Sequence, residues 1–363
     1  MIITGELLKD KVIVKKAKDV GRLYNKSHMG NTISKGYLEL NLLESVFLLD
    51  EEKIRIFKNK KEISFEEFVK LAAKKYKKFE AKYLVFKDLR RRGHAVRIED
   101  DKRYTFYKHQ EKNDSFFVCV FSEKDFFDIK KTSTLLDGLE KNTMLWFAIV
   151  DEEGDITYYN VSYKTLKGKN KTKKYSKIKA YLLDDKVLVF DKKNIKLLFE
   201  NEFFGKVFGK ALQLSFIESY YLLKNKNIVI FDKIDKKISE KDLLKLISKD
   251  QAIVYSDLKN KGIIPKTGFK FGTHFRAYTG HPDKIHAEYL VHVVKDNFKS
   301  VWAEISRAVR LAHSVNKEIV FARIISDEVE YINFGRLRPW LLKNLTIKYF
   351  YRKIYILIKI IIF

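Results

Sequence analysis

The sequence predicts an α+β protein that arose as a tandem duplication of one two-part unit. The chain has 363 residues, 46% of them hydrophobic, which is enough for two or more domains with sizeable cores. Several segments recur in the same order at a nearly constant spacing. Each copy opens with short strand and helix patterns and continues into a region richer in strands. We therefore expect each unit to combine a small α/β amino-terminal subdomain with a mixed-sheet subdomain.

The duplication is visible in four pairs of segments that lie 174 or 175 positions apart. The pairs are 5–14 with 180–189, 40–49 with 214–223, 54–57 with 228–231, and 63–71 with 238–246. A fifth pair, "FKDLRRRG" (86–93) and "YSDLKNKG" (255–262), follows at an offset of 169. Chance similarity does not preserve both order and spacing, so we infer that one unit was duplicated.

Strands followed by helices are expected at the start of each copy. Lys11–Lys15 and Lys186–Phe190 have strand-like patterns. The segments after them have apolar residues three and four positions apart, as on one face of a helix. These residues are Leu43, Val46 and Phe47 in the first copy and Ile217, Tyr220 and Tyr221 in the second. A second helix is expected after Ser64, because Glu67 completes a capping-box pattern, and Ser239 repeats the cap.

The later part of the second copy has strand patterns on either side of a helix. β-Branched and aromatic residues predict strands at 289–294, 318–324 and 329–334. Helical spacing predicts a helix in the first part of 301–324. Between the two copies, the lysine-rich segment 164–179 has few apolar residues and is predicted to be an exposed basic connector.

These patterns divide the chain into six parts. They are a first amino-terminal subdomain (1–75), a degenerate copy of the mixed-sheet subdomain (76–163), a basic linker (164–179), a second amino-terminal subdomain (180–248), a second mixed-sheet subdomain (249–337) and an apolar and basic tail (338–363). Arg352, Lys353 and Lys359 interrupt the apolar run of the tail, which is too short and too charged to cross a bilayer. An added strand, an amphipathic anchor and a translated extension without a role all remain open for it.

The charge of the chain points to a polyanionic partner. Lys and Arg number 73 against 47 Asp and Glu, which gives a formal net charge of +26. Nucleic acid is the natural partner for such a surplus. A lysine-rich surface that reflects an AT-rich genome or a hot habitat is the alternative. The single cysteine, Cys119, excludes an intrachain disulfide and is expected in the core. The chain has neither a signal-peptide pattern nor a membrane-spanning run, so we expect a cytoplasmic protein.

The residues that carry chemistry gather in the second copy. Segment 268–294 contains four histidines, and Lys317 follows the predicted helix. When the copies are aligned, Asn142 matches Asn316, and Thr143 therefore stands where the second copy has Lys317. His286 has no counterpart in the first copy. A unit that keeps its framework but lacks these residues is typical of a structural copy paired with an active one.

Five segments of the second copy resemble the catalytic unit of the archaeal tRNA-splicing (tRNA-intron) endonuclease family. In order, they are "YSDLKNKG", "TGFKFGTHFRAY", "HAEYLVHV", "SRAVRLAHSVNKEIVFARI" and "YINFGR". The tandem arrangement resembles the homodimeric form of that family, in which each chain has one active and one degenerate unit. The resemblance implies an endoribonuclease that cuts precursor tRNA at bulge-helix-bulge motifs without metal or cofactor. The implied products have 2′,3′-cyclic phosphate and 5′-hydroxyl ends.

The resemblance also implies roles for individual residues. Tyr278 matches the general base that takes the proton from the 2′-hydroxyl, His286 the general acid for the 5′-oxygen, and Lys317 the cation that stabilises the phosphorane. Arg310 and Arg336 match the pair that clamps a flipped bulge base. His281, in the same loop, is the one rival for the acid role, although only His286 has the "HAEYLV" context.

Physical chemistry is compatible with these roles. RNA carries its own nucleophile, so the enzyme supplies a proton acceptor, a proton donor and a fixed cation. A phenol holds its proton at neutral pH and acts as a base only where cations favour the phenolate. Arg276, Lys284 and Lys317 are the candidates for that task. Planar guanidinium groups stack on bases, as a clamp requires.

The acidic turn and the function of the chain each have a second interpretation. The acidic turn formed by Asp151, Glu152, Glu153 and Asp155 is either a solvated turn or, as the resemblance implies, a loop that docks on the active unit of a second chain. A non-catalytic RNA-binding or scaffold subunit of a larger endonuclease is the alternative function. The presence of all three catalytic positions argues against it.

Overall fold

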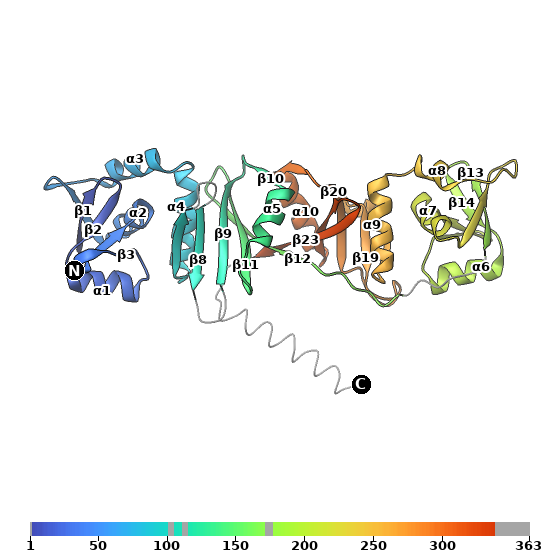
Figure 1. Ribbon diagram of the computed structural model, residues 1–363, viewed down its shortest axis with the longest axis horizontal. Helices are drawn as coiled ribbons and strands as arrows, with labels where there is room; N and C mark the ends of the chain where they lie inside the picture. The colour runs from blue at the N-terminus through green and yellow to red at the C-terminus, as the bar shows by residue number, and fades with distance from the viewer. Residues whose placement is uncertain (1, 101–104, 111–114, 171–176, 338–363) are drawn as a thin grey trace, which may run out of the picture. The chain divides into compact units, whose positions relative to one another are not determined.

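The computed structural model describes residues 2–100, 105–110, 115–170 and 177–337 (Figure 1). The tail at 338–363 and part of the predicted linker, 171–176, lie outside the described residues. Contacts divide the chain into two compact units. The described residues of the first are 2–100, 105–110, 115–126, 138–161 and 336–337, and those of the second are 127–137, 162–170 and 177–335.

The first amino-terminal subdomain is a sheet with helices between its strands. Its elements are β1 (Ile3–Leu8), β2 (Lys11–Val14), α1 (Ala17–Gly21), η1 (Arg22–Lys26), β3 (Asn31–Thr32), η2 (Ser34–Gly36), β4 (Leu38–Leu40), α2 (Leu42–Asp50), β5 (Ile54–Lys58), β6 (Lys61–Glu62) and α3 (Phe65–Lys75). The strand order is β3-β4-β2-β1-β5-β6. β1 is antiparallel to β2 and parallel to β5, and α2 is the crossover before β5.

The first mixed-sheet subdomain follows along the chain. Its elements are α4 (Phe79–Arg91), β7 (Val96–Asp100), β8 (Thr105–Gln110), β9 (Ser115–Ser122), β10 (Phe126–Asp128), α5 (Ile129–Asp137), β11 (Thr143–Val150) and β12 (Ile156–Tyr163). The strands pair in the order β7-β8-β9-β11-β12. β9 and β11 are parallel, and the other pairs are antiparallel. Contacts assign α5 to the second compact unit.

The second copy repeats both parts. Its amino-terminal elements are β13 (Ile178–Leu183), β14 (Lys186–Val189), α6 (Lys192–Lys196), η3 (Leu197–Asn201), β15 (Lys206–Phe208), β16 (Ala211–Leu214), α7 (Phe216–Lys224), β17 (Ile228–Phe231) and α8 (Glu240–Leu244). The remaining elements are α9 (Lys249–Asn260), β18 (Ile264–Thr267), η4 (Phe269–Phe271), β19 (Phe275–Tyr278), β20 (Tyr289–Lys295), β21 (Lys299–Val301), α10 (Trp302–Ser314), β22 (Glu318–Ile325) and β23 (Glu328–Leu337).

The α+β fold class and the tandem duplication are confirmed by the strand order. In the second copy the amino-terminal strands run β15-β16-β14-β13-β17, and the later ones β18-β19-β20-β22-β23. The mixed-sheet order matches that of the first copy strand for strand, and the amino-terminal order matches except that β6 has no counterpart strand. The single parallel pair of the mixed sheet also recurs, as β20 with β22. A shared topology with a shared pattern of strand directions follows directly from duplication of one unit.

The predicted helix caps are also confirmed. Ser64 accepts from the backbone of Glu67, and Ser239 accepts from Asp242, each in a complete capping box. The helix after Ser239 is shorter than its counterpart and ends at Leu244. A turn follows at 245–246, and Ser248 caps the next helix, α9.

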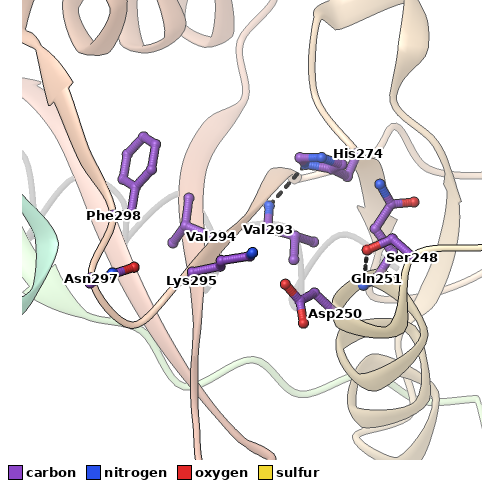
Figure 2. Close-up of a pocket in the computed structure, with 9 residues that line it drawn as sticks. All are labelled: Ser248, Asp250, Gln251, His274, Val293, Val294, Lys295, Asn297 and Phe298. Carbon is purple, nitrogen blue, oxygen red and sulfur yellow. Dashed lines mark hydrogen bonds between the residues drawn. The ribbon is translucent and has the colours of Figure 1, made fainter.

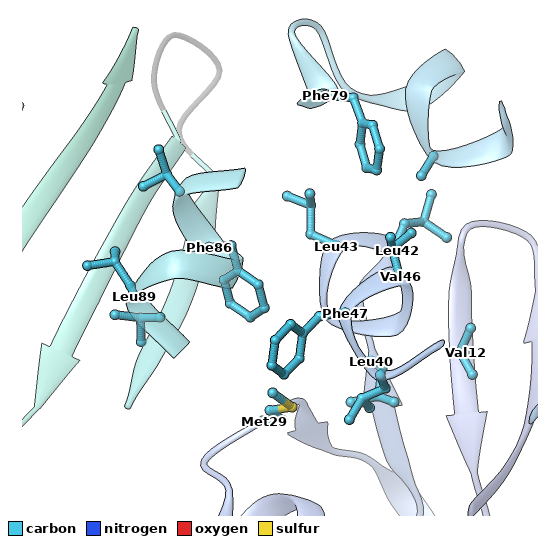
Figure 3. Packing of buried hydrophobic residues seen from close by; sticks show 14 of the residues in the cluster. Val12, Met29, Leu40, Leu42, Leu43, Val46, Phe47, Phe79, Phe86 and Leu89 are labelled. Atoms are coloured by element: carbon cyan, nitrogen blue, oxygen red, sulfur yellow. The ribbon is translucent and has the colours of Figure 1, made fainter. Parts of the chain in front are cut away.

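Each compact unit has its own core, and the two cores use equivalent contacts. In the first unit, Phe47 of α2 meets Phe86 of α4 edge to face, with ring centroids 5.6 Å apart (Figure 3). In the second unit, Tyr221 of α7 meets Tyr255 of α9 in the same way at 5.7 Å. Both contacts join an amino-terminal subdomain to the first helix of the mixed-sheet subdomain that follows it. Burying one such aromatic side chain contributes about 1.5–3 kcal/mol. Cys119 of β9 is buried in the first unit, as expected.

Residues 164–170 of the predicted connector are attached to the second mixed sheet, and only some of them are exposed. Leu166 is buried, and the backbone N–H groups of Gly168 and Lys169 donate to the carbonyls of Lys261 and Thr279 at 2.8 and 3.0 Å. A Cβ at Gly168 would lie 1.9 Å from the carbonyl oxygen of Gly262, so only glycine fits this approach. Lys167 and Lys169 are exposed, Lys164 is partly buried, and the backbone of the segment binds the mixed sheet. Within the described parts of the chain, no helix is both long and apolar enough to cross a membrane.

Candidate active site

The strand ladder of the second mixed sheet gathers the three predicted catalytic positions at one edge. Ala277, Tyr289 and Glu318 form one row across β19, β20 and β22. Neighbouring strands lie about 4.8 Å apart, so this row spans about 10 Å. Tyr278 follows Ala277, and Lys317 precedes Glu318. His286 lies three residues before Tyr289. The carboxyl end of β19 and the amino ends of β20 and β22 therefore bring these positions together.

Backbone hydrogen bonds extend the row into the loop that carries His286. The N–H of Glu288 donates to Ala277 at 3.1 Å, and the N–H of Glu318 donates to Glu288 at 3.0 Å. The hydroxyl of Thr279 donates to the carboxylate of Glu288. The segment just after His286 is thus fixed to the strands of both other candidates.

Tyr278 is held with its ring buried and a cation beside it. The residue is 8% exposed and packs with Ile264 and Ala287, the neighbour of His286. The guanidinium of Arg276 lies 5.8 Å from the centroid of the Tyr278 ring. Arg276 is one of the three cations named from the sequence, and its guanidinium is next to the ring of Tyr278.

The two candidate acids differ in how they are held. His286 is exposed, and its imidazole makes no hydrogen bond to any residue that the structure describes. His281 is tied into its own turn, because its Nδ1 accepts from the N–H of Asp283 at 3.3 Å. Its ring also packs edge-on against Phe203 at 4.6 Å. Both nitrogens of His286 are therefore open to a substrate, whereas Nδ1 of His281 is occupied.

Lys317 is positioned by the end of α10. Asn316 adopts a left-handed conformation with φ 54°, which stops the helix and directs the chain into β22. The N–H of Lys317 donates to Ala312 at 2.9 Å. Its ammonium donates to the carbonyl of Val315 at 3.2 Å and lies 5.7 Å from the centroid of the Phe271 ring. Sequence reasoning missed Phe271, because nothing local marks a loop aromatic as a neighbour of a lysine 46 positions away.

The first copy keeps this framework without the functional side chains. Asn142 is left-handed with φ 67°, as its counterpart Asn316 is. The next residue, Thr143, opens β11 and pairs with Ser115, which pairs with Gln110. By strand register, Thr143 therefore occupies the first-copy position that corresponds to Lys317. Gln110 occupies the position that corresponds to Tyr278. The first-copy position of His286 falls in 111–114, outside the described residues.

Two other histidines form a separate cluster at the opposite ends of β19 and β20. The rings of His274 and His292 lie 4.8 Å apart, and His274 Nδ1 accepts from the N–H of Val293 at 3.0 Å (Figure 2). Burial lowers the pKa of His274, and burial together with His274 lowers the pKa of His292 to about 4. The adjacent cleft of about 330 Å³ contains none of the predicted site residues. This cluster is neutral at physiological pH and is distinct from the candidate active site.

The connector residues 164–170 also contact the strands next to the candidate active site. The ammonium of Lys164 lies 2.6 Å from Glu318 Oε2 and 5.1 Å from the centroid of the Tyr289 ring. Together with the bond from Lys169 to Thr279, this contact holds the strand ends next to Lys317 and Tyr278.

Among the residues the structure describes, no group of three His, Cys, Asp or Glu side chains is arranged to hold a metal ion.

The two predicted arginines are both exposed and belong to different compact units. Arg310 is exposed on α10 of the second unit. Arg336 is exposed near the end of β23 and groups with the first compact unit.

The acidic turn 151–155 is the exposed tip of the β11–β12 hairpin. Asp151 Oδ1 accepts from the N–H groups of Glu153 and Asp155 at 3.1 and 2.8 Å. Glu152 forms an ion pair with Lys124 at 2.6 Å.

Comparison with known proteins matches both halves of each unit. Residues 79–158 and 249–332 match the catalytic C-terminal domain of the tRNA intron endonuclease family, and residues 3–69 and 178–244 match its N-terminal domain. The fold and these matches define a tandem pair of nuclease units, each with its amino-terminal domain. The chain belongs to the tRNA intron endonuclease family.

Three relatives match this chain over nearly the whole of their own length. A tRNA-splicing endonuclease of Methanococcoides burtonii is 38% identical over 352 residues, covering 92% of this chain and 99% of the relative. One from Methanosarcina barkeri is 34% identical over 349 residues, with the same two shares. The tRNA-splicing endonuclease of Methanococcus vannielii is 37% identical over 169 residues, which is 95% of its length but 44% of this chain. The last relative is therefore the size of a single unit.

Proposed function

We propose that the chain excises introns from precursor tRNA by cutting the RNA at bulge-helix-bulge motifs. The observation that supports this most is the gathering of the Tyr278, His286 and Lys317 positions at one sheet edge, in one of the two copies. Family membership supports cleavage of tRNA introns. The chemistry and the recognition below rest on the residues of that edge.

The reaction is an internal transfer at phosphorus. Tyr278, as phenolate, takes the proton of the 2′-hydroxyl, whose oxygen attacks the adjacent phosphorus. The bond from phosphorus to the 5′-oxygen breaks, and His286 gives that oxygen a proton. The products are a 2′,3′-cyclic phosphate and a 5′-hydroxyl. Each positioned acid or base contributes roughly 10² to 10⁴-fold in rate.

Lys317 stabilises the extra negative charge that the phosphorane carries. Its ammonium is steadied by the carbonyl of Val315 and the face of Phe271, so little reorganisation is needed during the reaction. The guanidinium of Arg276, 5.8 Å from the centroid of the Tyr278 ring, adds a second positive charge next to the base. A nucleophile within the substrate, an acid, a base and a cation together suffice, so we propose that the reaction needs no metal ion.

Recognition and assembly extend the same proposal. Arg310 and Arg336 clamp an unpaired base of the bulge between guanidinium planes. Two chains form a homodimer, in which the acidic turn 151–155 of one chain docks on the basic active unit of the other. The turn is suited to that contact because the bonds to Asp151 fix its shape while Glu153 and Asp155 remain exposed.

Cleavage of one labelled bulge-helix-bulge RNA by the purified chain tests the proposal. We expect two cuts, 2′,3′-cyclic phosphate and 5′-hydroxyl ends, and unchanged rates in EDTA. RNA binding without cleavage would instead favour a scaffold subunit, and 5′-phosphate products or full loss of activity in EDTA would favour a metal nuclease.

A further inference from the structure

An unusually exposed aromatic side chain stands beside the candidate active site. Phe269 is 87% exposed, more than any other large hydrophobic residue among those the structure describes. It belongs to the loop 268–274 between β18 and β19, which we call the Phe269 loop. Single exposed apolar residues are common on proteins. Two further observations set this one apart: the rigidity of its loop and the contact of that loop with Lys317.

The Phe269 loop is held rigid by its own hydrogen bonds. The N–H groups of Phe271 and Thr273 both donate to the carbonyl of Gly268, at 2.8 and 3.3 Å, and that of Gly272 donates to Phe269 at 3.1 Å. Gly272 has φ 61°, a conformation that favours glycine. A side chain on such a loop meets a ligand without first having to be ordered, which lowers the entropic cost of binding.

The same turn touches the candidate active site. Phe269 and Phe271 are the first and last residues of the single helical turn η4, and Phe271 lies against the ammonium of Lys317. Lys270, between them, is exposed. An aromatic face with a cation next to it is the combination that proteins use to hold single-stranded nucleic acid, because bases stack on the ring and phosphates pair with the charge.

We propose that Phe269 stacks on an unpaired base next to the cleaved phosphate and thereby determines which nucleotides are presented to Lys317. This proposal rests on the proposed function, because it takes bulged RNA as the substrate. Phe269 acts in binding and positioning, and it does not take part in proton transfer. An alternative occupant, a second copy of the chain, is separated from RNA by the test below.

Binding of bulge-helix-bulge RNA with 2′-deoxy nucleotides at the cut sites tests the proposal without any cleavage. We expect Phe269→Ala to raise Kd about 5- to 150-fold, as loss of one stacked base does. Phe269→Trp should restore wild-type binding. Phe208→Ala is the matched control, because Phe208 is also an exposed aromatic, at 63%, and belongs to a different element, β15.

A series of RNAs, each with one abasic site in a bulge, identifies the stacked base. At one position the abasic RNA should bind wild-type protein weakly, and Phe269→Ala should weaken it no further. An equal penalty at every position, or wild-type binding by Phe269→Ala, would overturn the proposal. A change of molar mass of Phe269→Ala in light scattering would also overturn it, because Phe269 would then be a contact between chains. If the unmodified RNA is bound but not cut by wild-type protein, the proposed function fails while the stacking result stands.

Discussion

The backbone N–H of Glu318 donates a 3.0 Å hydrogen bond to the carbonyl of Glu288. This bond joins the residue after Lys317 to the loop that carries His286, and the N–H of Glu288 continues the chain of bonds to Ala277, the residue before Tyr278. The relative placement of the three candidates is therefore set by main-chain bonds and does not depend on contacts among their side chains. Substitutions of those side chains should consequently leave the fold intact.

Lys317→Ala should reduce kcat about 10² to 10³-fold, because a preorganised charge opposite the phosphorane is lost. RNA affinity should change little, since one cation is removed from a surface with many. Single-turnover kinetics and filter binding measure the two effects. Lys295→Ala is the charge-matched control and should behave as wild type. Lys295 (Figure 2) is at the carboxyl end of β20, whereas the candidate active site is at the amino end of that strand. Full activity of Lys317→Ala would remove the lysine from the mechanism.

Tyr278→Phe should lose about 10² to 10⁴-fold in rate while its thermal stability stays near wild type. The ring still packs with Ile264 and Ala287, and only the hydroxyl is removed. Tyr331→Phe should instead lose thermal stability and keep its cleavage rate. Its hydroxyl donates to Asp257 Oδ2 at 2.6 Å, and the loss of that bond costs about 1–3 kcal/mol of stability without touching the site. Calorimetry and cleavage rates of both variants distinguish the roles, and equal rates for the two would contradict the assignment of Tyr278.

Stability should fall as the pH drops from about 6.5 toward 4, in part because of His292. The pKa of His292 is about 4 in the folded protein and 6.5 in the unfolded chain, so the unfolded state binds more protons in this window. At pH 5 the loss from His292 is about 2 kcal/mol, and His274 adds to it in the same direction. Urea unfolding at pH 5 and pH 8 measures the difference. His292→Asn should reduce it, and an unchanged difference in that variant would refute the assignment.

Reversing two charges on the acidic turn should weaken dimerisation. Glu152→Lys with Glu153→Lys leaves the turn itself intact, because Asp151 keeps its two backbone bonds. Sedimentation should show a raised dissociation constant at low salt and a smaller difference from wild type at high salt. The exposed turn between β13 and β14 provides the control pair, Asp184→Lys with Asp185→Lys. If the two double variants sediment alike, the docking proposal is wrong.

The sequence predicted those features that depend on local pattern or on repetition. The capping box at Ser64 and the alignment of Asn142 with Asn316 are of this kind, since each is determined by residues close together in the chain. The alignment in turn identified Thr143 as the counterpart of Lys317, and the strand register agrees with it.

Features that depend on long-range contacts could not be predicted. The composition of 164–170 indicated an exposed linker, but a single apolar residue, Leu166, and backbone bonds to Thr279 and Lys261 fix it to the sheet. Backbone groups are the same at every residue, so composition carries no record of such pairing. The contact of Phe271 with Lys317 was likewise beyond a local pattern.

The most direct test of a shared phosphate uses an RNA in which sulfur replaces the 5′-oxygen leaving group at one cut site. Sulfur leaves without needing a proton, so the general acid becomes dispensable. The account predicts that His286→Ala is slow on the oxygen substrate but close to wild type on the sulfur substrate, whereas Lys317→Ala stays slow on both. If His286→Ala is equally impaired on both RNAs, His286 does not protonate the leaving group, and the convergence of the three residues on one phosphate is contradicted.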